Sequence, residues 1–295
     1  MLKSLNSLKR LSSLMVFTQS AIVITGASVR LTGSGLGCST WPECTPGSFT
    51  PTPDQPESPL HAWIEFGNRL LTFVLLINAV LLFVSILRNK RRELRLLGAV
   101  QILGILAQGV LGGITVLTGL HPATVAAHFL LSIILIAAAL SLRQRAHGKV
   151  PTEIRLHSLT RRLARITLLL TALVIFAGTI VTGSGPHAGD EIAQRFNLDP
   201  RTISWIHADL VIALIGVTVA LLIAIRFAEP EETRLSWGIS ARNFLLVCLA
   251  QGLIGYTQYF TGLPELLVGF HILGSVLVWL TIWNLTIKGN VLTRS

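Results

Sequence analysis

The side chains of this sequence best suited to bind a metal are four histidines in apolar surroundings. They are His61, His128, His207 and His271, and each lies near the beginning of a long hydrophobic segment. A neutral imidazole is a common metal ligand and is typical of haem iron. A C-x-x-C-H motif is missing, so a haem would be bound non-covalently. These histidines therefore indicate a haem site or, as the alternative, a pathway for protons or ions.

A carboxylate lies close to one of these histidines. In the stretch HAWIEFGNRLLTF, the residues His61, Glu65, Asn68 and Arg69 fall within about two helical turns. Glu65 and Arg69 are four residues apart, a spacing at which two side chains on a helix can pair. This spacing fits a structural ion pair, whereas ionisable residues at the mouth of a membrane bundle often face its interior and act there. The residues alone leave both interpretations open.

Eight hydrophobic segments must position these side chains. They cover about residues 12–31, 66–87, 96–118, 123–142, 164–182, 205–225, 243–261 and 266–287. The chain is 51% hydrophobic and only 13% charged, with a mean hydropathy of +0.66. About 20 apolar residues span a bilayer as a helix, which satisfies its own backbone hydrogen bonds in lipid. The sequence therefore predicts an all-α, polytopic membrane protein with eight transmembrane helices.

The distribution of positive charge predicts the orientation of these helices. Eight spans place both termini and the loops 88–95, 143–163 and 226–242 on one side of the membrane. These segments and the adjoining helix ends hold all 24 Lys and Arg residues except Arg30, Arg69, Arg195 and Arg201. By the positive-inside rule, both termini are expected in the cytoplasm, and the protein in the cell membrane. Because basic loops account for the net charge of +10, no nucleic-acid partner is expected.

Two cysteines fall in the first loop on the opposite side. Cys38 and Cys44 are six residues apart in a loop that contains proline. The outer side is oxidising, so the pair can form a disulfide, and the alternative is two free thiols. Cys248 lies in an apolar run and is expected to be a packed core residue.

The chain contains an internal repeat. AQGVLGGITVLTGLHPATVAAHFLLS, residues 107–132, matches AQGLIGYTQYFTGLPELLVGFHILGS, residues 250–275, at an offset of 143 without a gap. The match aligns His128 with His271, and a shared imidazole in a hydrophobic run is unusual. Such a fixed-offset match indicates an internal duplication.

The duplication predicts two tandem four-helix bundles. We expect an N-terminal half at residues 1–145, a basic cytoplasmic linker at 146–163, and a C-terminal half at 164–295. Cofactors are commonly held between facing helices of such bundles. Parallel repeats also occur in transporters, so a haem-binding membrane electron carrier or a small-molecule transporter is the alternative to an enzyme.

Several motifs together resemble the heme A synthase family, membrane enzymes of cytochrome oxidase assembly. They are GASVRLTGSGLGC-x5-C, IEFGNRL, HFLLS and GFHILGS, and the resemblance covers nearly the whole chain. It implies oxidation of the C8 methyl of haem O to a formyl group, which gives haem A. It also implies a haem B cofactor whose iron is held by His207 and His271. The substrate haem is then expected in the N-terminal half, with His128 as an iron ligand.

Further roles follow from the same resemblance. Glu65 matches the essential glutamate of the family, and Cys38 and Cys44 match a pair that is a disulfide or redox-active in many members. Arg30 and Arg69 lie on the same side and are candidates to bind haem propionates, with interfacial anchoring as the alternative. The expected partners are haem O and haem A, the lipid bilayer, haem O synthase and cytochrome oxidase assembly factors.

The sequence departs from the family pattern at one position. Many members read E-x-x-H-R, with the histidine as a second ligand of the substrate haem, whereas Asn68 stands at that position here. Amides are poor iron ligands, so either His128 holds the iron alone or His61 takes part. His61 lies seven residues upstream, about 10 Å along a helix, and would need a shifted haem or an unwound helix end.

Overall fold

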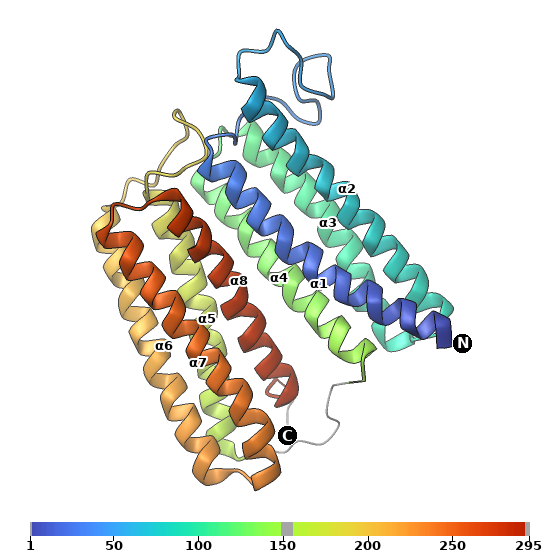
Figure 1. Cartoon of the computed structure of the whole chain (residues 1–295), viewed down its shortest axis with the longest axis vertical. Helices are drawn as coiled ribbons and strands as arrows, with labels where there is room; N and C mark the ends of the chain where they lie inside the picture. The colour runs from blue at the N-terminus through green and yellow to red at the C-terminus, as the bar shows by residue number, and fades with distance from the viewer. Residues whose placement is uncertain (1, 149–155, 293–295) are drawn as a thin grey trace. The chain divides into compact units, whose positions relative to one another are not determined.

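The computed structural model describes residues 2–148 and 156–292, which form eight long α-helices joined by loops (Figure 1). The helices are α1 (Leu2–Leu31), α2 (Pro59–Arg88), α3 (Arg95–Leu117), α4 (Pro122–Ala146), α5 (Ser158–Ser184), α6 (Pro200–Ala228), α7 (Glu231–Phe260) and α8 (Glu265–Lys288), with a short 3-10 helix, η1 (Arg92–Leu94), before α3. Within these described ranges there is no β-strand. All eight helices are long and apolar enough to cross a membrane. The prediction of an all-α, multi-pass membrane protein is confirmed.

The second helix begins earlier than its hydrophobic segment suggests. Its apolar run was expected to start near residue 66, but α2 begins at Pro59. Proline is favoured in the first turn of a helix, where its missing N–H would have no intrahelical partner in any case. His61 and Glu65 therefore lie in regular helix, on the same face as Asn68 and Arg69.

The helices group into two compact units. The first comprises residues 1–146 and 179–200, and the second comprises residues 147–178 and 201–295. In the first unit, α1 and α3 each pack against both α2 and α4, which closes a four-helix bundle (Figure 1). In the second unit, α7 packs against α8. The helix α5 contributes its residues up to Gly178 to the second unit and its last turns to the first.

The apolar core of the first unit fills the half of its bundle away from Glu65. Leu8 and Met15 of α1, Leu82 of α2 and Leu142 of α4 are fully buried there and belong to one cluster. In lipid, close van der Waals packing of this kind is a main force between helices. Glu65, Asn68 and His128 lie in the other half of the bundle.

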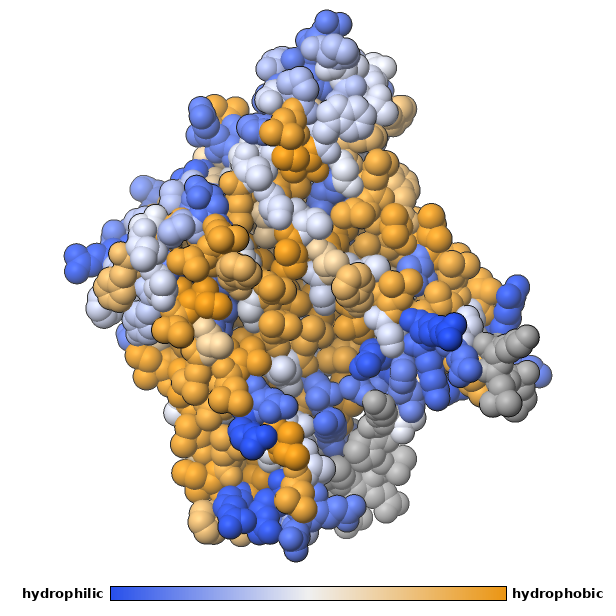
Figure 2. All heavy atoms as spheres, viewed as in Figure 1, coloured by the Kyte–Doolittle hydropathy of each residue, from blue (hydrophilic) through white to orange (hydrophobic). Residues whose placement is uncertain are grey.

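Large apolar side chains cover the outside of the helices. Phe73, Leu103 and Leu253 are 62%, 65% and 71% exposed. Figure 2 shows hydrophobic residues along the middle of the helices and hydrophilic residues gathered toward their ends. An apolar surface of this extent is unfavourable in water and is the expected surface in a bilayer.

Candidate functional site

The second unit brings two histidine rings close together in an edge-on arrangement. His207 on α6 and His271 on α8 have ring centroids 6.4 Å apart, with the ring planes at 69°. Two metal–imidazole bonds of about 2.0–2.1 Å, together with the ring radii, place the centroids of two axial imidazoles roughly 6 Å apart. The observed separation therefore leaves room for one metal centre between the two rings.

Glycines on neighbouring helices make space for these rings. A Cβ atom built on Gly178 of α5 would lie 3.3 Å from Cε1 of His207, and one on Gly255 of α7 would lie 3.0 Å from Cε1 of His271. Any larger residue would press on the imidazole. The Nε2 of Gln251 donates to the backbone carbonyl of His271 at 2.6 Å, which fixes α7 against α8 at this level.

The ring nitrogens test whether this site suits a haem. The Nδ1 of His271 is buried and has no hydrogen-bond partner in the part of the chain that the structure describes. Buried polar atoms in folded proteins are almost always satisfied, so an unpaired one indicates a missing partner. Over the described residues, no group of three or more His, Cys, Asp or Glu side chains forms a conventional metal cluster. Two opposed imidazoles fit a haem iron better than a zinc ion.

The first unit repeats half of this arrangement around His128. A Cβ atom on Gly112 of α3 would lie 3.2 Å from Cε1 of His128 on α4. The Nε2 of Gln108 donates to the carbonyl of His128 at 3.0 Å and to Oγ of Ser132 at 2.6 Å. The Nδ1 of His128 is buried without a partner among the described residues, as it is in His271. The surroundings of His128 and His271 are thus equivalent: each has a glycine against its ring, a glutamine bonded to its carbonyl and an unpaired Nδ1.

The α2 side of the first unit carries an amide in place of an imidazole. Asn68 accepts a hydrogen bond from Oγ1 of Thr25 at 2.8 Å. A Cβ atom on Gly26 of α1 would lie 3.8 Å from Nδ2 of Asn68. His61 lies two turns away on the same unbroken helix, so of the two conditions for its participation, an unwound helix end is not present and a shifted haem is the one that is left.

The predicted ion pair between Glu65 and Arg69 is formed, and it is buried. Glu65 is only 6% exposed, and its Oε1 accepts hydrogen bonds from Nη2 and Nε of Arg69 at 2.6 and 3.0 Å. Its Oε2 accepts a third from the backbone N–H of Cys38 at 2.7 Å. The spacing of four residues predicted the pair, but only the fold shows that the loop between α1 and α2 adds a third hydrogen bond to it.

Arg69 makes three further hydrogen bonds to carbonyls of that loop. Its Nη1 donates to the carbonyls of Thr40 and Glu43 at 3.0 and 3.2 Å, and its Nη2 also donates to the carbonyl of Cys38 at 3.0 Å. With the two bonds to Glu65, all five N–H groups of the guanidinium are engaged. A haem propionate could bind Arg69 only by displacing one of these contacts.

The predicted disulfide is present and lies in the same loop. Cys38 and Cys44 are joined and fully buried, while Cys248 is a buried free cysteine, as expected. A Cβ atom on Gly37 would lie 2.4 Å from the carbonyl oxygen of His61, so the loop touches the first turn of α2. The disulfide loop therefore sits directly on the helix that carries Glu65.

Arg30 has a different environment from Arg69. Its Nη2 donates to the carbonyl of Thr182 at 2.7 Å, within the first unit. Its Nε is buried and has no partner among the described residues. Of the two arginines predicted to bind propionates, Arg30 keeps an unpaired N–H and Arg69 does not.

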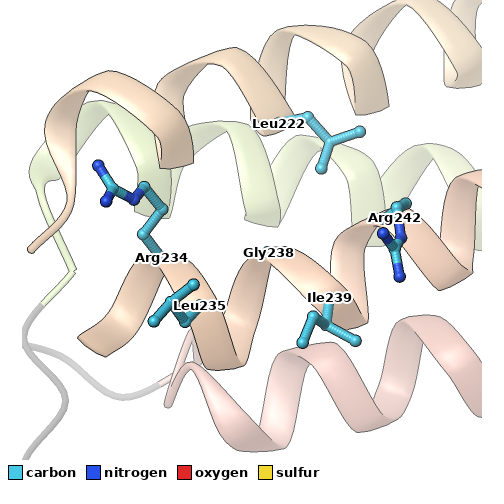
Figure 3. Close-up of a pocket in the computed structure, with 6 residues that line it drawn as sticks. All are labelled: Leu222, Arg234, Leu235, Gly238, Ile239 and Arg242. Atoms are coloured by element: carbon cyan, nitrogen blue, oxygen red, sulfur yellow. The ribbon is translucent and has the colours of Figure 1, made fainter. Parts of the chain in front are cut away.

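A separate pocket of about 310 Å³ lies between α6 and α7 (Figure 3). It is lined by Leu222, Arg234, Leu235, Gly238, Ile239 and Arg242. On α7, Arg242 precedes Gly255 by 13 residues, about 20 Å along the helix. This pocket therefore does not include the facing histidines.

Sequence reasoning identified the imidazoles but missed the residues that shape their surroundings. The glycines and glutamines of the two sites were visible only as identical positions of the repeat, Gly112/Gly255 and Gln108/Gln251. Their presence beside a shared histidine was the available signal.

Comparison with known proteins agrees with this geometry. The family described as cytochrome oxidase assembly protein matches residues 9–283 of the chain. A protein named heme A synthase from Lysinibacillus sphaericus is 40% identical over 124 residues, which cover 41% of this chain and 39% of that protein. Proteins of the same name from Exiguobacterium sibiricum and Bacillus pumilus are 28% identical over 179 residues and 26% identical over 277 residues. The first two matches span 39% and 59% of those relatives, and the third covers 88% of its relative and 87% of this chain.

Proposed function

Because the chain belongs to the family of cytochrome oxidase assembly proteins, which matches residues 9–283, we propose that it is a heme A synthase. The proposed reaction oxidises the C8 methyl group of haem O to the formyl group of haem A. The observation that carries the proposal is the pair of similarly built imidazole sites, one of which has a buried carboxylate on the adjoining helix face. The same observation disfavours a simple electron carrier, since a carrier would have no use for that carboxylate.

The second unit is proposed to hold a haem B cofactor. His207 and His271 would hold the haem iron, and the glycines Gly178 and Gly255 leave room for their rings. When bound, this haem supplies one-electron transfer. The sequence contains no flavin or nicotinamide motif for another redox cofactor. The side chains of the second unit therefore serve to bind and orient the cofactor.

The first unit is proposed to hold haem O, with His128 as an iron ligand. Converting the methyl to a formyl group consumes one water and releases four electrons and four protons. Glu65 is the acceptor for protons at this site, and Arg69 and the Cys38 N–H fix the position of its carboxylate. Arg30, with its unpaired Nε–H, is the better candidate for a propionate contact, and His61 and Asn68 line the α2 side.

The wider organisation belongs to the same proposal. The two halves of the chain, residues 1–145 and 164–295 with a basic linker at 146–163 between them, descend from one duplicated four-helix bundle. Supporting this, Gly112 and Gly255 face equivalent histidines, and Gln108 and Gln251 bond to their carbonyls. Both termini lie in the cytoplasm and the protein resides in the cell membrane. Its proposed partners are haem O synthase and cytochrome oxidase assembly factors.

Extraction of haem from cells tests the proposal. The full chain is expressed in a host that makes haem O but not haem A, and extracted haems are separated and identified by mass. We expect haem A in cells with the wild-type chain and none with His128→Ala. Haem O unchanged in the presence of folded, haem-containing protein would refute the synthase activity and leave an electron carrier.

A further inference from the structure

We propose that the side-chain amide of Asn68 is a hydrogen-bond donor over an open binding position opposite His128. This position takes a small ligand that carries a hydrogen-bond acceptor, such as water, hydroxide or dioxygen. The inference rests on the proposed binding of a haem substrate at His128. Asn68 is thereby a residue that touches the small ligand, and His128 is the one protein ligand of the substrate iron.

The contacts of two equivalent glycines place Asn68 where the second unit has an imidazole. Gly26 and Gly178 begin the matching stretches GASVRLTGSG and GTIVTGSG of α1 and α5. A Cβ atom on Gly178 would meet the ring of His207 at 3.3 Å, and a Cβ atom on Gly26 would meet Nδ2 of Asn68 at 3.8 Å. The α2 residue thus occupies the place of the α6 ligand.

The amide is oriented by Thr25. The hydroxyl of Thr25 lies 2.8 Å from Oδ1 of Asn68 and 3.2 Å from the carbonyl of Ile22, and the shorter bond is the one to Asn68. Because the carbonyl end of the amide is occupied by a donor, the NH2 end is the group available to the site. An NH2 group donates hydrogen bonds and is not an iron ligand.

Neighbouring side chains on α2 do not fill the open position. His61 is seven residues away on an unbroken helix, about 10 Å along the axis. Glu65 has both carboxylate oxygens bonded, to Arg69 and to Cys38. An asparagine side chain is also shorter than the reach of a histidine to its Nε2, so it extends less far toward His128 than a histidine at this position would.

The two units therefore differ in one functional respect. In the second unit, imidazoles on both sides close the site to further ligands, whereas the first unit offers an imidazole on one side and a donor on the other. Hydrogen-bond donors on the distal side of a haem decide whether small ligands bind there. The first unit is built to admit one.

Ligand binding to the purified full chain tests the inference. The protein, carrying its resident haem, is titrated with haemin, and the second equivalent is examined by absorption and electron paramagnetic resonance spectroscopy. We expect this second haem to be high-spin and to bind cyanide, the probe, while the resident haem stays low-spin. His128→Ala should abolish the second equivalent and keep the spectrum of the first.

Three variants of α2 test whether Asn68 acts as a hydrogen-bond donor, as an iron ligand or only by filling space. Asn68→His should make the second haem low-spin and close it to cyanide. Asn68→Leu should keep it high-spin but raise the cyanide Kd about 5–10-fold, the effect of one lost hydrogen bond. Asn78→Leu is the matched control, because Asn78 is a buried asparagine on the same helix, ten residues further on, and its cyanide Kd should equal that of the wild type.

Contrary results would distinguish failure of this inference from failure of the proposed function. A wild-type second haem that is low-spin and closed to cyanide overturns the open position but leaves the proposed function standing. An unchanged cyanide Kd in Asn68→Leu shows that the amide is not a donor and overturns its proposed role. Two results overturn both this inference and the assignment of the substrate site. The first is a wild-type chain that binds no second haem, and the second is a His128→Ala variant that still binds it.

Discussion

At the scale of single residues, the contact between Glu65 and the disulfide loop decides how the carboxylate can be tested. Glu65 accepts three hydrogen bonds, two from Arg69 and one from the Cys38 N–H. Glutamine has nearly the same shape, but its NH2 would face one of these donors. The usual conservative replacement is therefore not structurally silent here.

The first prediction concerns Glu65→Gln. We expect it to abolish formation of haem A, to keep the low-spin haem of the second unit, and to cost about 1.5–3 kcal/mol of stability through one lost bond to a charged group. Haem extraction and thermal unfolding measure the two effects. Glu43→Gln is the control, because the carboxylate of Glu43 accepts a bond only from the exposed N–H of Gly47 among its described contacts, and it should behave as the wild type. Wild-type haem A yield from Glu65→Gln would remove Glu65 from the mechanism.

The second prediction concerns the facing imidazoles. His207→Ala or His271→Ala removes one of two rings that lie 6.4 Å apart, so a haem between them loses an axial nitrogen. We expect each variant to lose the low-spin spectrum or the haem itself. His187→Ala, which alters a histidine of an external loop, should leave the spectrum unchanged. Unaltered spectra and haem content in both site variants would contradict the assignment.

The histidines of the candidate site could be identified from the sequence, but the residues that contact Glu65 and Arg69 could not. An imidazole in an apolar run is conspicuous, so His128, His207 and His271 could be selected without a structure. The bonds from Arg69 to the loop could not, because three of its five contacts depend on how residues 38–43, which lie 26 to 31 positions earlier in the chain, fold back onto α2. The buried state of the Glu65 pair follows from that loop and was equally hidden.

At the scale of helices, glycines on α3 and α7 allow these helices to lie close to the rings of His128 and His271. The third prediction uses pairs of glycines one turn apart. Gly255→Ala and Gly112→Ala place a Cβ 3.0 and 3.2 Å from a histidine ring carbon, tighter than an ordinary contact, so haem content should fall.

The controls for this prediction lie on the same helices. Gly252 and Gly109 have open space where a Cβ would be added, so their replacement by Ala should keep haem content and favour the helix by up to about 1 kcal/mol. Haem-to-protein ratios and unfolding temperatures distinguish the two sets. Equal losses in all four variants would show that the glycines act through the helices and not through the rings.

The fourth prediction concerns the external loop. Alkylation of the denatured protein without reductant should label Cys248 and leave Cys38 and Cys44 unmodified, as read by mass spectrometry. Cys38→Ser should cost about 2 kcal/mol, as expected for a short closed loop. It should also weaken activity more than haem B binding, because the loop contacts Glu65 and lies in the other unit. Full labelling of all three cysteines would contradict the disulfide.

Helix existence and order were predictable from hydropathy, whereas helix starts were not. The apolar run of the second span begins at residue 66, yet Pro59 starts α2 because a proline suits the first turn. This earlier start is what places His61 and Glu65 in regular helix. Polar residues at a membrane surface carry no hydropathy signal for their own helical state.

At the scale of the whole molecule, the fifth prediction concerns orientation. Basic residues concentrate in the loops at 88–95, 143–163 and 226–242, so these loops and both termini should be cytoplasmic. Green fluorescent protein fused after residue 295 should fluoresce, and alkaline phosphatase fused there should be inactive. Alkaline phosphatase fused within the loop after α1 should be active. The reverse pattern would invert the topology.

The packing of the first unit has a consequence for how the proposed substrate enters and leaves. Leu8, Met15, Leu82 and Leu142 are fully buried side chains of one cluster, which fills the half of the bundle away from Glu65. We therefore expect the proposed haem substrate to enter and leave on the side of the disulfide loop, because this cluster blocks the other half of the bundle interior. Whatever delivers the substrate or collects the product is then expected to meet the protein on that side, even if the delivering enzyme works from the other.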